Sequence, residues 1–277
     1  MAIATASLVY NRHQIPIPPD WHITVGQTSL TIVLVNAASN ALNQATDVEA
    51  DKISKPYRPI PRGLIRADTA QSLAYLLYLF ALLRAVTINL WFGIFIFLIM
   101  VFTVTYSLPP RMKKYLFINQ VWIAIPRGLF GILASWSVFG ANPFTPTPLA
   151  IGLISTVYLI GGMSTKDLTD AEADKKTGVK TLINTYGNTK TALIIFPFMF
   201  FPFLFIPIFI NQGVLEPYVW PLTFLVIFSL IILYLILKGK ESDVFENVNA
   251  WSLMYFQYIF FAMGFSLLTI FSDILPF

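Results

Sequence analysis

The chain has 277 residues, of which 56% are hydrophobic and only 12% are charged, with a net charge of +4 and a mean hydropathy of +0.70. Soluble chains carry about 25% charged residues, and disordered chains combine low hydrophobicity with high charge, so the composition excludes both classes. It indicates an integral membrane protein. The chain has no cysteine and only two histidines, which excludes a disulfide framework and a cysteine or histidine metal cluster.

Uncharged stretches predict the membrane spans, since a spanning helix needs about 20 apolar residues. Arg84 separates the second stretch from the third, and Arg127 lies inside the fourth. Prolines at 197, 202 and 207 predict a kink in the sixth. Residues 1–10 are apolar but too short to cross, so we expect a truncated first helix and an atypical segment over 1–20. The eight predicted spans are 21–46, 69–83, 85–110, 115–139, 149–165, 191–215, 217–237 and 247–272.

The fold class is therefore predicted to be all-α, a polytopic transmembrane helical bundle in a single domain over 1–277. Alternate loops hold 15 of the 18 basic residues. The positive-inside rule predicts that these loops are cytoplasmic. They are residues 47–66, 107–114, 166–190 and 238–246. The basic excess fits this topology and anionic lipid or phosphate ligands, and we expect no nucleic acid partner and no obligate protein partner.

Half of the acidic residues lie in two short segments of the same loops. Both segments contain D-x-E-A-D-K, at 47–52 and at 170–175, and each follows a predicted span at its cytoplasmic end. The repeat favours an internal duplication.

The spacing of the acidic residues predicts a metal-binding site. On a helix, Asn43, Asp47 and Asp51 share one face, and Asp167, Asp170 and Asp174 share another. Like charges stacked this way are destabilising unless a cation lies between them, and oxygen-only ligands favour Mg²⁺ or Ca²⁺. Mg²⁺ completes its shell with substrate phosphates, so two facing acidic helices can hold two Mg²⁺ ions around one diphosphate.

Two other interpretations are open from the residues alone. Acidic residues beside basic ones are often only a solvated loop. A cation-coupled transporter is the alternative function, although transporters place their acids near the middle of the bilayer and these acids lie at its cytoplasmic edge.

Five segments together resemble the UbiA-type intramembrane prenyltransferases. Two are the acidic motifs, N-x-x-x-D-x-x-x-D from residue 43 and D-x-x-x-D from residue 170. Residues 55–63 (KPYRPIPRG) resemble the family's N-x-P-x-R-P-I-P-x-G, and residues 106–113 (YSLPPRMK) resemble its Y-S-x-P-P-x-x-x-K. Residues 166–182 resemble K-D-x-x-D-x-x-x-D-x-x-x-G-x-x-T-L. The resemblance covers about residues 20 to 190, and the family has nine transmembrane helices, which fits eight spans and a partial one.

The resemblance implies an enzyme that transfers a prenyl chain from an isoprenyl diphosphate to a lipophilic acceptor in the bilayer, with Mg²⁺ as cofactor. Residues 55–63 look like the branch of digeranylgeranylglyceryl phosphate synthases and chlorophyll synthases. This branch favours a lipid glycerol phosphate as the acceptor and leaves an aromatic quinone precursor or a tetrapyrrole open.

The resemblance also implies roles for individual residues. The metal and diphosphate ligands would be Asn43, Asp47, Asp51, Asp170 and Asp174, with Asp167 and Glu172 as weaker candidates. Arg58, Lys113 and, less clearly, Arg62 would contact the substrate, and Tyr106 would stack near the prenyl cation or lie in the interfacial aromatic belt. An arginine inside a span is functional by default, so Arg127 is a candidate residue for binding an anionic acceptor. His22 is expected at the membrane interface.

Overall fold

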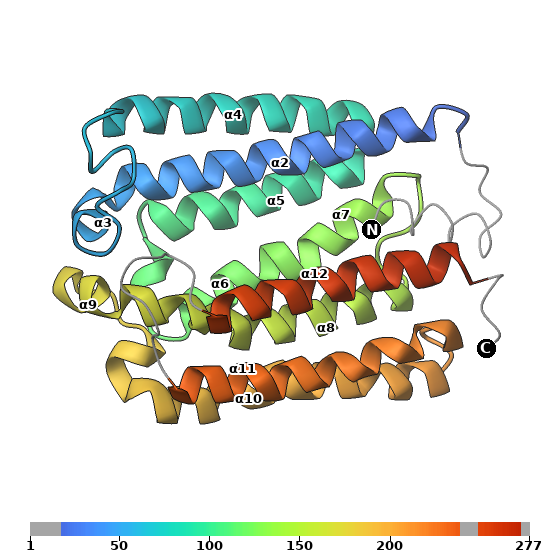
Figure 1. Cartoon of the computed structure of the whole chain (residues 1–277). Helices are drawn as coiled ribbons and strands as arrows, with labels where there is room; N and C mark the ends of the chain where they lie inside the picture. The colour runs from blue at the N-terminus through green and yellow to red at the C-terminus, as the bar shows by residue number, and fades with distance from the viewer. Residues whose placement is uncertain (1–17, 239–248, 273–277) are drawn as a thin grey trace.

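The computed structural model describes residues 18–238 and 249–272, and this part of the chain is a bundle of helices without strands (Figure 1). The predicted all-α fold is confirmed, while the predicted partial helix at 1–10 lies outside the described residues. The helical elements are α2 (Trp21–Thr46), α3 (Val48–Ser54), α4 (Ala67–Ile88), α5 (Leu90–Ser107), η1 (Met112–Lys114), α6 (Ile118–Ala124), the π-helical η2 (Ile125–Phe130), α7 (Gly131–Ser137), α8 (Pro146–Gly162), η3 (Met163–Lys166), α9 (Asp167–Thr177), α10 (Leu182–Asn211), η4 (Pro217–Leu225), α11 (Val226–Lys238) and α12 (Asn249–Ile270).

Six helical stretches within the described residues are long and apolar enough to cross a membrane. Two further predicted spans are helical but fall outside this group. The helix α2 has no charged residue, yet its five amide side chains lower its hydropathy, and residues 118–137 change helix type twice. The total of eight spans therefore stays a prediction. The six stretches are Ala67–Ile88, Leu90–Ser107, Pro146–Thr177, Leu182–Asn211, Pro217–Lys238 and Asn249–Ile270.

The boundary between the second and third predicted spans is wrong. Arg84 does not interrupt the helix, because its aliphatic stem can lie along the helix while its guanidinium lies 5.9 Å from the centre of the Phe80 ring. The break comes at Asn89, whose backbone is extended and whose side-chain oxygen accepts a hydrogen bond of 2.8 Å from the amide of Trp91. An asparagine that caps the next helix thus decides the boundary, not the charge.

The sixth predicted span lies in α10, in which two helical parts join across a kink. The first part starts at Leu182 behind a capping box formed by Thr181 and Asn184. The recorded break in helical geometry is at Gly187, where φ is +74° and ψ is 174°, a conformation that favours glycine. The three prolines lie farther along the helix, and the kink predicted at them stays a prediction.

Two hydrophobic cores hold the bundle. The first joins α2, α4, α5 and α7, and α4 presents a stripe of buried alanines that includes Ala74, Ala81 and Ala85. Small residues let helix backbones approach closely in a membrane, where lipid offers no hydrophobic driving force between helices. The second core joins α8, α10, η4, α11 and α12, with α8 the most enclosed: 12 of its 17 residues are buried.

A buried polar network ties α12 to the second core. Gln257 donates hydrogen bonds of 2.9 Å to the carbonyl of Leu225 and to Ser229, and Tyr158 donates to Gln257 over 3.0 Å. Ser229 in turn donates to the carbonyl of Met199 over 2.8 Å. These bonds therefore tie α12 to α8, α10, η4 and α11.

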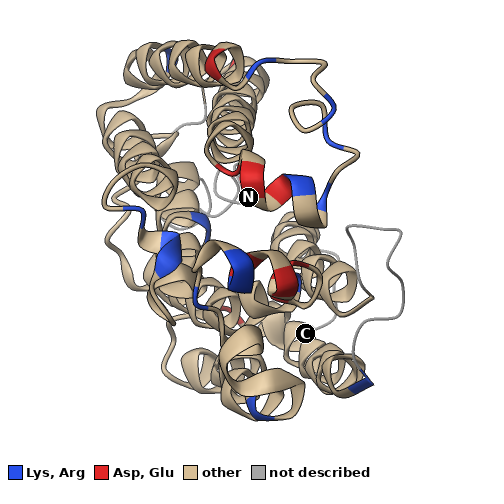
Figure 2. Cartoon of the chain, turned by 90° about the vertical axis from the view of Figure 1, so that its left-hand side faces the viewer, with Lys and Arg blue, Asp and Glu red and all other residues tan. Residues whose placement is uncertain are grey.

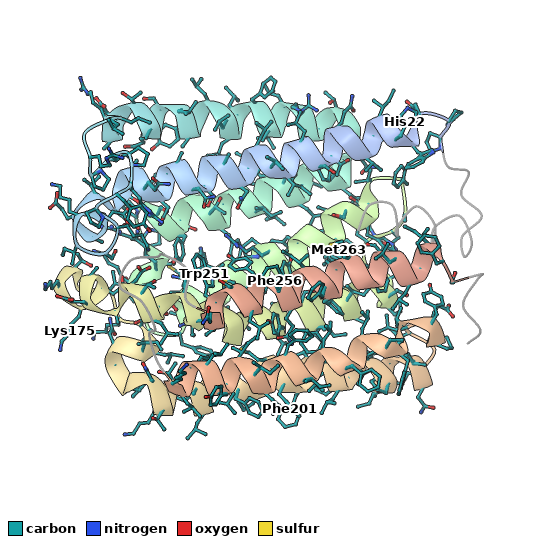
Figure 3. All side chains as sticks on the ribbon, in the orientation of Figure 1. His22, Lys175, Phe201, Trp251, Phe256 and Met263 are labelled. Carbon is teal, nitrogen blue, oxygen red and sulfur yellow. The ribbon has the colours of Figure 1, made fainter. Side chains whose placement is uncertain are left out.

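Charged residues gather at one end of the bundle, where α3, α9 and η1 lie (Figures 1 and 2). The acidic and basic segments that the structure describes thus lie together at one end of the bundle, and the membrane face to which they belong stays a prediction. His22 lies at the other end, exposed at the start of α2, as Figure 3 shows.

Candidate active site

The first acidic motif lies at a break between two helices. The prediction of one continuous helical face is wrong, because α2 ends at Thr46 and Asp47 has φ −110° and ψ 19° before α3 begins. The physical cause lies outside the motif. Arg111 donates to the carbonyl of Thr46 over 3.0 Å and to Asp47 Oδ1 over 2.8 Å, so it satisfies a backbone acceptor at the end of α2. Asn43 donates to Asp47 Oδ2 over 2.9 Å.

The second acidic motif lies on α9, which continues from the enclosed α8 through the short 3₁₀ helix η3. Asp170 and Asp174 line the cavity described below, as the predicted spacing requires. Asp167 is buried behind them and does not line it; its Oδ1 is 3.1 Å from Nζ of Lys166. Glu172 is on the outer face of the same helix, exposed and paired with Lys176.

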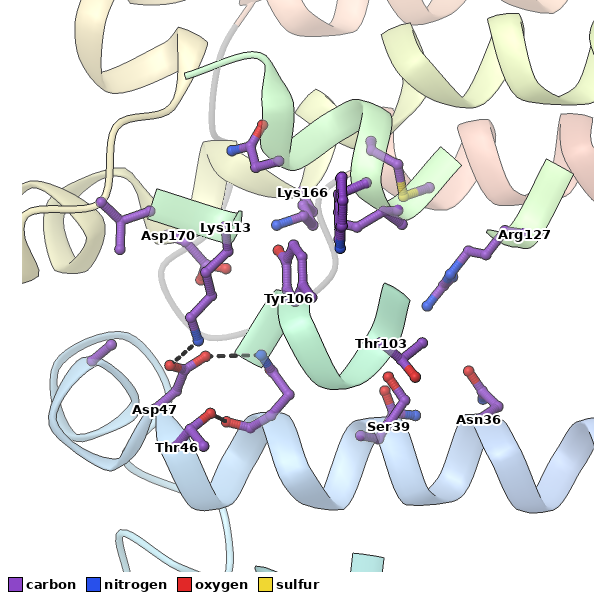
Figure 4. A pocket seen from close by; sticks show the side chains of 18 of the residues that line it. Asn36, Ser39, Thr46, Asp47, Thr103, Tyr106, Lys113, Arg127, Lys166 and Asp170 are labelled. Atoms are coloured by element: carbon purple, nitrogen blue, oxygen red, sulfur yellow. Dashed lines mark hydrogen bonds and ion pairs between the residues drawn. The ribbon is translucent and has the colours of Figure 1, made fainter. Parts of the chain in front are cut away.

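Basic side chains join the two motifs. Lys55, which follows α3, donates to both oxygens of Asp170 over 2.6 and 2.7 Å, so it crosses from the first motif to the second. Arg58 donates to both oxygens of Asp51 over 3.1 and 3.0 Å. Lys113 donates to Asp47, as the dashed line in Figure 4 shows. The predicted meeting of two acidic segments and their basic neighbours is therefore present.

Burial shifts the pKa of two of these groups. Burial raises the pKa of Asp51, and the guanidinium of Arg58 opposes that rise. Burial lowers the pKa of Lys113, and the carboxylate of Asp47 opposes that fall. In both cases the desolvation of the charge is the larger effect, so these charges are held at a cost in free energy.

The two motifs close the charged end of a cavity of about 780 Å³. The cavity runs between α2 and α5 on one side and η2, α9 and α12 on the other. Its deeper part has aromatic walls, in which Phe102 and Trp122 stack with their ring centres 4.4 Å apart. Polar side chains of α2, among them Asn36 and Ser39, continue along the cavity from the acidic end (Figure 4). One space thus combines a charged end with an apolar interior.

Of the other predicted site residues, three line the cavity and one does not. Tyr106 lines the cavity, and Nζ of Lys113 lies 6.0 Å from the centre of its ring. Arg127 lines the deeper part and donates to the hydroxyl of Tyr255 over 2.8 Å. Arg62 is exposed and does not line the cavity. The structure therefore brings Tyr106, Lys113 and Arg127 to one space and leaves Arg62 outside it.

Several cavity residues were not singled out in the sequence. Lys55, Arg111 and Lys166 belong to recognised segments, but charge pattern alone does not tell a ligand from a topology signal. Tyr255 and Tyr258 lie three residues apart on α12, and the hydropathy of that stretch indicates only a span. No signal in one sequence could have placed α12 beside the acidic motifs.

The side chains of the two acidic motifs are of the type that binds a hard cation such as Mg²⁺. Asn43, Asp47, Asp51, Asp170 and Asp174 line the cavity, and these side chains bind metal ions through oxygen. Asp174 makes no side-chain hydrogen bond or ion pair with any other residue in the part of the chain that the structure describes, so its oxygens are available as ligands. In the described ranges no three acidic or histidine side chains already form a metal-binding group, because basic side chains stand between the carboxylates.

The sequence matches a known family and several of its members. Residues 2–256 match the UbiA prenyltransferase family. The chain is 32% identical over 167 residues to the digeranylgeranylglyceryl phosphate synthase of Pyrococcus horikoshii, a match that covers 59% of this chain and 57% of the relative. With that of Sulfurisphaera tokodaii it shares 28% over 182 residues, 63% of each chain. The matched part thus spans less than two thirds of these relatives.

Solved structures share the fold. A UbiA homolog from Archaeoglobus fulgidus bound to GPP and Mg²⁺ has a TM-score of 0.72 at 18% identity, covering 97% of this chain and 94% of that one. A digeranylgeranylglyceryl phosphate synthase has a TM-score of 0.61 at 23% identity, covering 97% and 90%. The apo structure of a UbiA homolog from Aeropyrum pernix K1 has a TM-score of 0.71 at 16% identity, covering 99% and 97%.

Proposed function

Because the chain belongs to the UbiA prenyltransferase family, we propose that it transfers a prenyl chain from an isoprenyl diphosphate to a lipophilic acceptor and releases diphosphate. The observation that carries this proposal is the meeting of two acidic motifs and their basic partners at one end of an aromatic-walled cavity. The names of the curated relatives favour a glyceryl phosphate lipid as the acceptor.

We further propose Mg²⁺ as the cofactor, as in the complex of the Archaeoglobus homolog with GPP and Mg²⁺. Asn43, Asp47 and Asp51 would hold it from one side and Asp170 and Asp174 from the other, and we propose that these residues would hold two ions together with the diphosphate. When bound, Mg²⁺ would supply a Lewis acid for the charge that develops on the departing diphosphate. The oxygen-only donor set supports Mg²⁺ over softer metals.

The chain's own residues would bind and shield the donor substrate. Lys113 and Arg111 contact Asp47, and both can turn to diphosphate oxygens when a metal takes over that carboxylate. Arg58 stands in the same relation to Asp51. The ring of Tyr106 and the aromatic walls would exclude water from the prenyl cation and stabilise it.

The reaction balances in atoms and charge. The allylic C–O bond breaks, and the electron pair leaves with the diphosphate oxygen. An acceptor oxygen would then form a new bond to the same allylic carbon and give up its proton to the released diphosphate. The basic residues act mainly on the first step, because charge develops on the diphosphate there.

The transporter alternative finds no support in the comparisons, which lead to prenyltransferases. The position of the acids agrees, since α3 and α9, which carry both motifs, lie at one end of the bundle and not at its middle (Figure 1).

The direct test is catalysis by the purified chain in bilayer discs. Prenyl diphosphates of several lengths are combined with a monoalkyl glycerol phosphate, and the products are identified by mass. We expect a Mg²⁺-dependent ether product and one diphosphate released per product. Failure to form a prenylated product with any donor and any acceptor of a broad panel would refute the function.

We also propose that the acidic end faces the cytoplasm, as the positive-inside rule predicts. The chain has no native cysteine, so single cysteines report cleanly. Thr177→Cys at the end of α9 should react with an impermeant thiol reagent only from the cytoplasmic side, and Asn142→Cys, exposed in the turn before α8, only from the opposite side. The reverse labelling pattern would overturn this orientation.

A further inference from the structure

Arg127 is held in place by an unusual stretch of helix. It lies in the π-helical segment η2, between Pro126 and Gly128. A Cβ at Gly128 would lie 2.5 to 2.6 Å from the side chain and backbone of Thr156, so only glycine lets η2 press this closely against α8. Such single-turn π segments widen a helix locally and are frequent at functional sites. The position of Arg127 is therefore fixed by the packing of its neighbours.

The guanidinium has one protein partner in the described part of the chain. Its Nη1 donates to the hydroxyl of Tyr255 over 2.8 Å, while the hydroxyl of Tyr258 donates to the backbone carbonyl of Arg127 over 3.1 Å. No carboxylate among the described residues pairs with it. An arginine has five N–H donors and stays charged, so most of its donor capacity is open to a ligand.

Two further features surround this cation. Trp251, one turn from Tyr255 on α12, lines the same cavity, and its ring centre is 5.5 Å from that of Tyr255. Its indole N–H is buried and has no hydrogen-bond partner. Arg127 points into the cavity on the side across from Asn36 and Ser39 of α2 (Figure 4). Arg127, Tyr255 and Trp251 thus line one region of the cavity, and no acidic side chain in the described ranges pairs with the guanidinium there.

The depth of this region separates it from the acidic motifs. Ser39 and Asn36 precede Asp47 by eight and 11 residues, which is about 12 and 16 Å along a helix. The region therefore lies two to three helical turns from the aspartates that would hold the diphosphate. A compact molecule placed between them could present a nucleophile to the prenyl carbon and an anionic group to Arg127.

We propose that Arg127, with Tyr255 and Trp251, binds an anionic group of the prenyl acceptor, a phosphate or a carboxylate. This inference rests on the proposed function and specifies the acceptor's chemistry. Arg127 is exposed and lines the cavity, so its open N–H donors are accessible to a bound anion, and an anion there would give an arginine inside a span the charged partner that it lacks among the described residues. An acceptor that lacks a charge cannot do so, which makes Arg127 a selector of anionic acceptors.

The test compares acceptor kinetics for Arg127→Met and Arg84→Met. Arg84 is the matched control, since it lies within the helical span α4, contacts Phe80 and does not line the cavity. Three acceptors are used: a monoalkyl glycerol phosphate, a hydroxyaryl carboxylate and an uncharged monoalkyl glycerol. Diphosphate release from the prenyl donor without acceptor reports folding and the donor half of the site, and Arg127→Lys tests whether a positive charge partly restores binding.

For Arg127→Met we expect the KM of the anionic acceptor to rise by about 10- to 100-fold, the range of a lost charge-assisted hydrogen bond. The KM of the prenyl donor, diphosphate release and the rate with the uncharged acceptor should stay near the wild-type values, and Arg127→Lys should recover part of the loss. Whichever anionic acceptor the wild type uses tells phosphate from carboxylate.

Two results would overturn the inference alone. One is an unchanged KM for both anionic acceptors in Arg127→Met, and the other is an equal loss with charged and uncharged acceptors, which would mark a structural role. If the wild type prenylates none of the three acceptors nor any other of a broad panel, the proposed function fails and the inference fails with it.

Discussion

Asp174→Asn is expected to lower kcat for prenyl transfer by about three orders of magnitude or more. The carboxylate lines the charged end of the cavity, and amide substitution keeps its shape but removes the charge that a metal ligand needs. Loss of Lewis-acid stabilisation of about 4 kcal/mol corresponds to a factor of about 10³ in rate. Asp174 forms no direct ion pair among the described residues, and the nearby Lys166 and Lys55 keep their contacts with Asp167 and Asp170, so the fold should be kept.

Glu172→Gln is the matched control on the same helix. Glu172 points away from the cavity and is paired with Lys176 on the exposed face of α9. Initial rates are measured against Mg²⁺ concentration for both variants and for the wild type in excess chelator. Rates for Asp174→Asn that reach the wild-type value at saturating Mg²⁺, or turnover of the wild type in chelator, would contradict the role of the acidic motifs.

Lys113→Met should reduce kcat/KM for the prenyl diphosphate by about 100- to 1,000-fold. Loss of one positioned donor to a developing anion costs that much in related sites. Lys113 is only 5% exposed and contacts Asp47, so its ammonium is already oriented toward the metal and diphosphate region. Methionine fills a similar volume, and Asp47 keeps its contact with Arg111 at 2.8 Å, so the carboxylate is not left alone.

The same change at Lys175 serves as the control. Lys175 is exposed on α9 and points away from the bundle in Figure 3, and it does not line the cavity. Lys175→Met should retain wild-type kinetics. Melting temperatures of both variants are measured beside the rates. If Lys113→Met loses activity only in proportion to a loss of folded protein, its role is structural and the assignment to the diphosphate is wrong.

The sequence predicted the parts of the fold that hydropathy alone controls. The span at 21–46 was predicted with the boundaries that α2 has, and the Pro-Pro stop after Tyr106 agrees with the end of α5 at Ser107. The two acidic motifs could be found because acids are rare in this chain and the D-x-E-A-D-K repeat marks them twice. These signals are local, so one sequence contains them fully.

The errors arise where distant residues decide a local structure. No proline or glycine signals the break at Asp47. The side chains that bind Asp47 there belong to Arg111 and Lys113, which lie 64 and 66 residues away in the sequence. A helix boundary at Arg84 was wrong because a single charge does not end a helix, whereas a capping asparagine does. The aromatic residues of α12 reach the cavity through the packing of the second core, which hydropathy does not encode.

The pairing of the acidic motifs has a consequence for how ligands bind. Asp47, Asp51, Asp167 and Asp170 each have a lysine or arginine nitrogen within 3.1 Å. A metal ion that arrives alone would strip carboxylates from their partners and leave buried cations unpaired. A diphosphate that arrives alone would draw the cations and leave carboxylates unpaired. Only when both arrive does every charge exchange one partner for another.

The two ligands should therefore bind with strong positive cooperativity, and linkage requires the effect to be mutual. Calorimetric titration of Mg²⁺ should give an affinity at least tenfold higher with diphosphate present than without it. Equal affinities would mean that the ion pairs do not oppose binding. With the pairs in place, a resting enzyme in a cell rich in free Mg²⁺ and free phosphates should bind either ion alone only weakly. Its charged residues should exchange partners only when both ions are present.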